Sequence, residues 1–234
     1  MDYMTKHRPT SATATTTEDR HDYLPAAGRD SLLPFYDLFT AALGVAKLHR
    51  RLIDQAELAD GQRVLEIGCG PGKLSLRAKR MHPGIQLIGS DPDPRALALA
   101  QRKARNLKGI SFERAYAQRL PYPDASFDRV LSSLMLHHLD DDDKAATAAE
   151  IQRVLRPGGS LHLVDFTQQA HAHGAHDIHA FLARRVLKSG HVAHSGGEEI
   201  VHLFTAAGLE CTQTATRRHP IMGQYNYFRA TRPR

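Results

Sequence analysis

The stretch RVLEIGCGPGKLSL, residues 63–76, decides the fold. It opens with a short apolar run, Val64, Leu65 and Ile67, of the kind that forms a buried strand. Three glycines at alternate positions follow, and from Lys73 onward the composition favours a helix. A strand, a glycine turn and a helix in this order form the opening unit of a nucleotide-binding α/β fold.

Outward from this stretch, strand-like and helix-like segments alternate. We expect strands at 63–67, 85–91, 110–117, 127–135 and 160–166, and helices at 73–81, 94–106, 141–155 and 196–208. Two further strand-like runs, 209–218 and 223–232, predict an antiparallel hairpin. Strands that alternate with helices indicate right-handed βαβ crossovers. We therefore predict an α/β, Rossmann-like fold, with a mostly parallel seven-stranded sheet, a C-terminal antiparallel hairpin and helices on both faces.

Composition limits the class of protein. The chain has 234 residues, of which 41% are hydrophobic and 24% charged, as is ordinary for a globular protein. No apolar stretch approaches the roughly 18 residues that a membrane span needs, and the first 22 residues contain no apolar core of a secretory signal. The two cysteines, Cys69 and Cys211, offer no disulfide framework and fit a reducing compartment. We expect a cytoplasmic protein with no membrane span.

The chain divides into three predicted parts. Residues 1–22 are polar and Thr-rich, and we expect a disordered tail. Residues 23–58 carry apolar side chains at helical spacing and predict an N-terminal helical cap. Residues 59–234 form the main domain, and the segment 168–195 is too long for an ordinary connection, which predicts a lid-like insertion.

The formal net charge is +6, with fifteen histidines counted as neutral. Basic residues are interleaved with acidic ones in most helices, which indicates a solvated basic surface. A basic patch near Arg217, Arg218 and residues 229–234 is the alternative. No nucleic-acid-binding module is appended, so nucleic acid is not the expected partner. Oligomeric state has no signal in the sequence.

The glycine loop fits neither of the common phosphate-binding patterns. The dinucleotide pattern G-x-G-x-x-G needs a glycine three residues after Gly70, where this chain has Lys73. The phosphate-binding loop G-x-x-x-x-G-K-[ST] needs a hydroxyl at the position of Leu74. A G-x-G-x-G loop therefore points to another nucleotide-type ligand.

Three blocks of sequence carry a resemblance to a known family. The block VLEIGCGPG with Asp91 after it, the block LPYPDASFDRVLSSLMLHHL (120–139) and the block LRPGGSLHLVDF (155–166) resemble the class I S-adenosylmethionine (SAM)-dependent methyltransferases. Within that family the chain is similar to the ubiquinone/menaquinone C-methyltransferase-like, small-molecule branch. The resemblance covers residues 60 to 167 and implies SAM as the cofactor and S-adenosylhomocysteine as its product.

The resemblance also implies the residues that bind the cofactor. The loop glycines allow the backbone to approach the methionine portion of SAM. Glu66 sits under the loop and organises the amino-acid end, and Asp91 accepts the ribose hydroxyls. Capping the helix at Pro94 is the alternative role for Asp91, although Asp93 is equally placed to cap it. The implied set is Glu66, Gly68, Cys69, Gly70, Gly72, Asp91, Pro92, Tyr116, Ala117, Gln118, Ser132 and Ser133.

One position departs from the family pattern. Members often carry an Asp that holds the adenine amino group, and Tyr116 stands in that place here. Backbone groups near Ala117, with Tyr116 or Gln118, would then hold the adenine.

Two residues are candidates for the acceptor side. His137 is a candidate general base because imidazole titrates near neutral pH. Packing or capping at the helix start is the alternative for His137 and the favoured role of His138. Tyr36 is a candidate to line the acceptor pocket, with helix packing as the alternative. Methyl transfer to a soft or already anionic nucleophile needs no base, since in-line positioning can supply most of the rate.

We expect no metal site. The four aspartates at 140–143 cap a helix and complement its dipole. The histidine-rich segment 171–179 fits a lid or a solvated helix better than a zinc site. The predicted function is SAM-dependent methyl transfer to a small molecule by direct SN2 displacement. A nucleic-acid methyltransferase, or a non-catalytic protein that binds SAM or metal, is the alternative.

Overall fold

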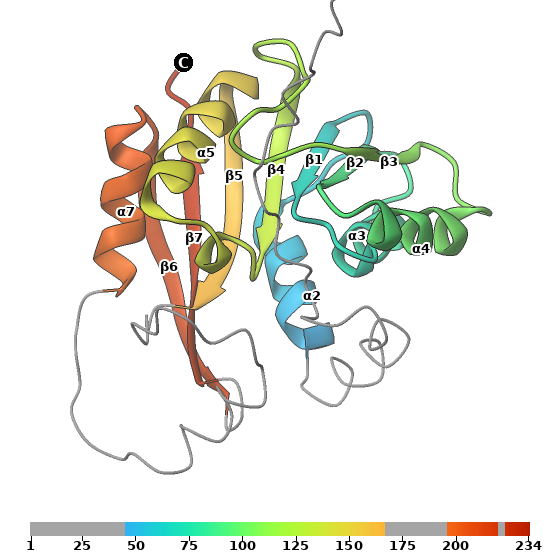
Figure 1. Cartoon of the computed structure of the whole chain (residues 1–234), viewed down its shortest axis with the longest axis horizontal. Helices are drawn as coiled ribbons and strands as arrows, with labels where there is room; N and C mark the ends of the chain where they lie inside the picture. Colours follow the sequence, from blue (N-terminus) through green and yellow to red (C-terminus); the bar gives the residue numbers. More distant parts are fainter. Residues whose placement is uncertain (1–44, 167–195, 220–222) are drawn as a thin grey trace, which may run out of the picture.

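The computed structural model describes residues 45–166, 196–219 and 223–234 (Figure 1). Within them, seven strands form one sheet in the order β3-β2-β1-β4-β5-β7-β6. The strands are β1 (Arg63–Ile67), β2 (Gln86–Asp91), β3 (Ile110–Arg114), β4 (Phe127–Ser133), β5 (Leu155–Phe166), β6 (Glu210–His219) and β7 (Gly223–Thr231). Strands β1 to β5 pair in parallel, and β7 runs antiparallel to both β5 and β6. The predicted parallel sheet with a C-terminal antiparallel hairpin is confirmed.

Helices cover both faces of this sheet, as predicted. Figure 1 shows α2, α3 and α4 on one side of the strands and α5 and α7 on the other. Their bounds are α2 (Val45–Ala56), α3 (Lys73–Met81), α4 (Pro94–Ala104), α5 (Asp141–Val154) and α7 (Gly196–Ala206), with a short 3-10 helix, η2, at Leu136–His138. Within the described ranges, no helix has the length and apolar character needed to cross a membrane.

The core has a layer on each face of the sheet. Under α5 and α7, the rings of Phe127, Phe204 and Phe228 are buried. On the other face, Leu52 and Ile53 of α2 are fully buried in a cluster shared with β1, β2 and β4. Helix α2 therefore contributes to the hydrophobic core on this face of the sheet. Residues 1–22, most of the predicted cap and the 168–195 insertion lie outside the described residues, so the domain division stays a prediction.

Two strands end earlier than predicted, and both ends lie at the carboxyl edge of the sheet. Strand β3 stops at Arg114 instead of residue 117, and Tyr116 then pairs with Arg119 in an isolated antiparallel bridge. Strand β4 stops at Ser133 instead of residue 135. Leu134 has a φ of 56°, which a regular strand does not accommodate. The chain therefore turns at both points and presents its next residues above the edge.

Strand β5 starts earlier than predicted, at Leu155 instead of residue 160, directly after α5 ends at Val154. Its pairing with β4 jumps from Phe127↔Leu155 to Arg129↔Ser160. The intervening residues include Pro157, which has no backbone N–H to give to the ladder. The remaining boundaries differ from the prediction by at most two residues.

The strand order places the reversal of the winding between β1 and β4. From β1 the chain adds β2 and β3 on one side, and it returns to add β4 and β5 on the other. Open α/β sheets bind ligands beyond the carboxyl ends of their strands at such a switch point. The residues that follow β1, β2, β3 and β4 therefore lie around this switch point.

Candidate functional site

The glycine loop follows β1 in a backbone conformation that only glycine adopts easily. Gly68, Gly70 and Gly72 have φ values of 70°, 49° and 77°. A Cβ at Gly68 would collide with the side chain of Met135, whereas a Cβ at Gly70 would enter open space. The N–H groups of Gly68 and Cys69 donate to the carbonyl of Ser90 at 2.9 and 3.0 Å. The loop is thus tied to β2, and Gly70, although itself buried, leaves the space beside its Cα clear for a ligand.

Asp91, the last residue of β2, is joined to this loop. Its Oδ2 accepts from the N–H of Gly70 at 2.7 Å, and its Oδ1 accepts from the N–H of Asp93 at 2.9 Å. Burial raises the pKa of the Asp91 carboxyl, and these two hydrogen bonds act against that rise. Asp93, not Asp91, caps α4, because its Oδ1 accepts from the N–H of Arg95 at 2.8 Å. The capping role considered for Asp91 is therefore wrong.

Glu66 belongs to β1, and its carboxylate accepts a hydrogen bond from the hydroxyl of Ser75 in α3. Its side chain is buried, and burial raises its pKa to about 8 despite the hydrogen bond from Ser75. Near neutral pH a substantial fraction of Glu66 is therefore protonated. Cys69 is also buried with a free thiol, and burial raises the pKa of that thiol.

The two serines at the end of β4 differ in their partners. Ser132 Oγ donates to the carbonyl of Ile67 at 3.2 Å and so ties β4 to β1. Ser133 Oγ is buried and has no hydrogen-bond partner among the described residues. An unpaired buried hydroxyl costs about 1–3 kcal/mol, so Ser133 is suited to a polar ligand at this edge.

The residues after β3 lie beside Asp91. The N–H of Ala115 donates to the carbonyl of Asp91 at 3.3 Å, which places the predicted adenine segment next to the end of β2. In that segment Tyr116 and Gln118 are half-buried and Ala117 is buried. Pro92, on the same side, accepts from Arg114 Nε at 3.1 Å.

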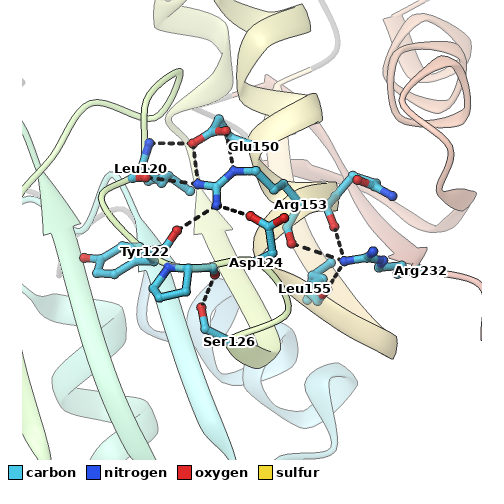
Figure 2. A network of polar contacts seen from close by, with 10 residues as sticks. Leu120, Tyr122, Asp124, Ser126, Glu150, Arg153, Leu155 and Arg232 are labelled. Carbon is cyan, nitrogen blue, oxygen red and sulfur yellow. Dashed lines mark hydrogen bonds and ion pairs between the residues drawn. The ribbon is translucent and has the colours of Figure 1, made fainter.

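A network of polar contacts holds the loop that leads from this segment into β4 (Figure 2). Arg153 of α5 binds both carboxylate oxygens of Glu150 at 2.7 and 2.9 Å. The same guanidinium donates to the carbonyls of Leu120 and Tyr122 and to the carboxylate of Asp124. Glu150 also accepts from the N–H of Leu120 at 2.7 Å, and the hydrogen bond from Arg153 lowers the pKa of Glu150. Helix α5 thereby fixes the path of the loop.

His137 lies in η2, directly above the carboxyl ends of β4 and β5. Its Nδ1 is 2.6 Å from Oδ1 of Asp165, a residue of β5 that is fully buried. The ring of Phe166 meets the imidazole edge-on at a centroid distance of 5.1 Å, and the ring of His138 lies 4.0 Å from it. Sequence reasoning missed Asp165, although a polar residue near the end of a buried strand was a signal for it. Tyr36 lies outside the described residues.

The predicted helix cap in the aspartate run is confirmed, because Asp140 Oδ1 accepts from the N–H of Asp143 at 2.8 Å. In the described ranges, no group of three or more His, Cys, Asp or Glu side chains is arranged to hold a metal ion. The segment 171–179 lies outside those ranges.

An open hollow of about 420 Å³ lies between Arg63, Gln86 and Phe127 at the amino ends of the strands, away from the glycine loop.

The fold and site together define a Rossmann-like domain with a nucleotide-type ligand site at its switch point. A family model described as "Methyltransferase domain" matches residues 64–159. The chain is 39% identical over 144 residues to a demethylmenaquinone methyltransferase of Deinococcus radiodurans, an alignment that covers 60% of this chain and 59% of that protein. It is 31% identical over 169 residues to a ubiquinone/menaquinone biosynthesis C-methyltransferase of Hahella chejuensis, with 68% and 67% covered.

Solved structures share the fold of this chain. The YcgJ protein of Bacillus subtilis superposes with a TM-score of 0.62 at 21% identity, over 80% of this chain and 98% of that one. The chain belongs to the class I SAM-dependent methyltransferase family, in its ubiquinone/menaquinone C-methyltransferase-like branch. It spans less than two thirds of the length of the Deinococcus relative.

Proposed function

We propose that the protein transfers the methyl group of SAM to a small-molecule acceptor by direct SN2 displacement and releases S-adenosylhomocysteine. The observation that carries this proposal is the contact between Asp91 and the N–H of Gly70. It joins the carboxylate at the end of β2 to a loop whose Gly70 is open to a ligand. A carboxylate there suits a pair of ribose hydroxyls, and a glycine loop without Cβ atoms suits close approach of an amino acid moiety.

In this proposal the chain's residues divide the cofactor between them. The loop over Gly68–Gly72, supported by Glu66, holds the methionine end, and Asp91 holds the ribose. The adenine lies against Tyr116, Ala117 and Gln118. The sulfonium of bound SAM supplies the methyl group as an electrophile. The unpaired hydroxyl of Ser133 lies at the same edge of the sheet, at the end of β4 and three residues before η2.

The acceptor side is proposed from the residues above β4 and β5. The rings of His137 and Phe166 lie side by side at this edge, and an aromatic ring beside an imidazole suits a flat acceptor. The relatives are named for quinone biosynthesis, so a hydroxylated aromatic such as a demethylmenaquinol is the first acceptor to test.

A cytoplasmic location stays a prediction. Both Cys69 and Cys211 are free thiols, which is consistent with a reducing compartment.

The experiment is an activity screen with the full chain. Quinols, phenols, thiols and amines are each incubated with SAM, and formation of S-adenosylhomocysteine is measured. Asp91→Ala serves as the cofactor-site variant, and Arg50→Met, which changes an exposed ion pair on α2, serves as the matched control. The proposal is supported if Asp91→Ala lowers turnover and Arg50→Met leaves it unchanged. SAM binding without turnover on any acceptor class contradicts methyl transfer and favours a non-catalytic binding protein.

A further inference from the structure

The side-chain carboxylate of Asp165 accepts more hydrogen bonds than its position in a strand requires. Its Oδ2 accepts from the N–H groups of Leu136 and His137 at 2.7 and 3.3 Å. Its Oδ1 accepts from the N–H of Phe166 at 2.7 Å and lies 2.6 Å from Nδ1 of His137. The carboxylate therefore has three backbone donors and one imidazole around two oxygens, in a fully buried position.

This arrangement determines where the imidazole of His137 carries its proton. A carboxylate that accepts backbone hydrogen bonds at both oxygens is ionised and has no proton to donate. The short contact at Oδ1 therefore requires that Nδ1 of His137 be the donor. In the neutral ring Nε2 is then unprotonated and basic. The side chain of His137 is 29% exposed, whereas that of Asp165 is fully buried, so the basic nitrogen is on the accessible part of the pair.

The imidazole is also restrained by its neighbours. Phe166 meets it edge-on with an interplanar angle of 71°, and His138 packs against it at 40°. Both the ring plane and the tautomer are thus set by the fold before any acceptor binds. Such preorganisation is what a proton-transfer group needs.

We propose that Asp165 is a positioning residue that fixes His137 as the proton acceptor for the methyl acceptor. The inference rests on the proposed methyl transfer. An acceptor X–H loses its proton to Nε2 of His137 as X forms a bond to the methyl carbon. The bond between carbon and sulfur breaks, its electron pair stays on sulfur, and neutral S-adenosylhomocysteine leaves. Asp165 stabilises the imidazolium that forms, and the proton then passes to water.

This proton transfer favours one class of acceptor. Proton removal at the transition state helps a nucleophile that carries a weakly acidic proton, such as a hydroxyl group or a ring carbon activated by one. A tertiary amine or a thiolate has no such proton and gains nothing from His137. We therefore expect His137 and Asp165 to matter for hydroxyl-bearing acceptors and to be dispensable for thiolates.

The first test reads the tautomer of His137 by nitrogen-15 NMR of the full chain without cofactor. The proposal expects the proton on Nδ1 in the wild-type protein and a changed tautomer population in Asp165→Asn. A wild-type proton on Nε2, or an Asp165→Asn variant that folds and keeps the wild-type tautomer, overturns it. Because no SAM is present, this readout does not depend on the proposed function.

The second test compares kinetics with a hydroxyl-bearing acceptor. General acid–base catalysis contributes about 10²–10⁴-fold, so His137→Gln should lower kcat by that factor with little change in KM for SAM. Wild-type kcat should fall as pH is lowered, because the imidazolium cannot accept a proton, and His137→Gln should lose that dependence. Among the described residues, Asp165 and His138 are the titratable groups that face His137. Arg50→Met, at an exposed ion pair on α2, is the control and should retain both rate and pH profile.

The second test also covers the case in which Asp165→Asn does not fold. A His137→Gln variant within about threefold of wild type overturns the proposal, as does an unchanged pH profile. If Asp165 served only to cap η2, its substitution would lower the unfolding free energy without altering the tautomer of His137. A chain that binds no SAM and turns over no acceptor overturns the proposed function instead, whatever the tautomer.

Discussion

Arg153→Met tests whether α5 holds the loop between β3 and β4. The substitution removes the donor to two carbonyls and breaks the paired contact with Glu150, whose side chain is 19% exposed. Hydrogen bonds to charged groups contribute about 1.5–3 kcal/mol each, but they are not additive within one network. The side chain of Asp124 is 77% exposed, so its contact adds little.

We expect Arg153→Met to lower the free energy of unfolding by about 2–3 kcal/mol, because Glu150 and two loop carbonyls lose their donor. For a chain of this size, that corresponds to a fall in Tm of roughly 4–12 °C. Urea denaturation and a thermal scan measure both values. Affinity for SAM should fall as well, because the loop follows directly on the predicted adenine segment.

Two variants control the interpretation of Arg153→Met. Arg153→Lys keeps the charge but loses the planar fork, so its loss should be intermediate. Arg50→Met breaks an exposed ion pair of 3.8 Å between side chains that are 67% and 57% exposed, and it should cost no more than about 0.5 kcal/mol. If Arg153→Met cost no more than Arg50→Met, the network would not hold the loop in place.

Three further predictions concern the cofactor site and the core. Asp91→Ala should weaken SAM binding by about 1.5–3 kcal/mol, as expected for hydrogen bonds to a charged group; an unchanged affinity by calorimetry, with an intact circular dichroism spectrum, would mean that Asp91 does not touch the cofactor. Gly70→Ala should cost about 1–2 kcal/mol of stability from its left-handed backbone and also abolish SAM binding. Gly61→Ala, at a φ of 81° with open space around it, should show the strain alone, and equal effects on SAM binding would contradict the placement of Gly70. Burial and nearby cations lower the pKa values of His49 and His162 to about 3, so the unfolded state binds protons first and stability is lost as pH falls from about 6.5 towards 3. The two histidines together should cost about 2–3 kcal/mol between pH 7.5 and 5.5. This cost is measured as the difference in pH dependence between the wild type and a His49→Gln/His162→Gln variant, because the raised pKa of Glu66 stabilises the fold over the same range. Equal pH dependence of the two proteins would show that the histidines are not buried as neutral rings.

Much of the sheet was predictable because its signals are local. The strand–glycine–helix order at 63–76 and the alternation after it depend on neighbours in sequence, and both predicted the fold correctly. Strand ends were less predictable. Nothing local indicated that Leu134 would take a positive φ or that Tyr116 would leave β3 for a bridge with Arg119.

The site shows the same division. The position of Asp91 at the end of a strand was predictable from the apolar run before it, and the structure assigns the cap of α4 to Asp93. Its contact with the cofactor stays a prediction. Asp165 was missed as a site residue because its role depends on His137, which is 28 residues away in sequence. Arg153 was missed because its partners belong to a loop about 30 residues earlier in the chain. Pairings across such distances appear only when the sheet has formed.

In the proposed function, SAM binds at the switch point between β1 and β4. Isothermal titration calorimetry of the full chain with SAM, S-adenosylhomocysteine and NAD tests it most directly. We expect micromolar binding of SAM and S-adenosylhomocysteine at one site, with no comparable binding of NAD. NAD binding tighter than SAM, or no heat with either SAM or its product, would contradict it.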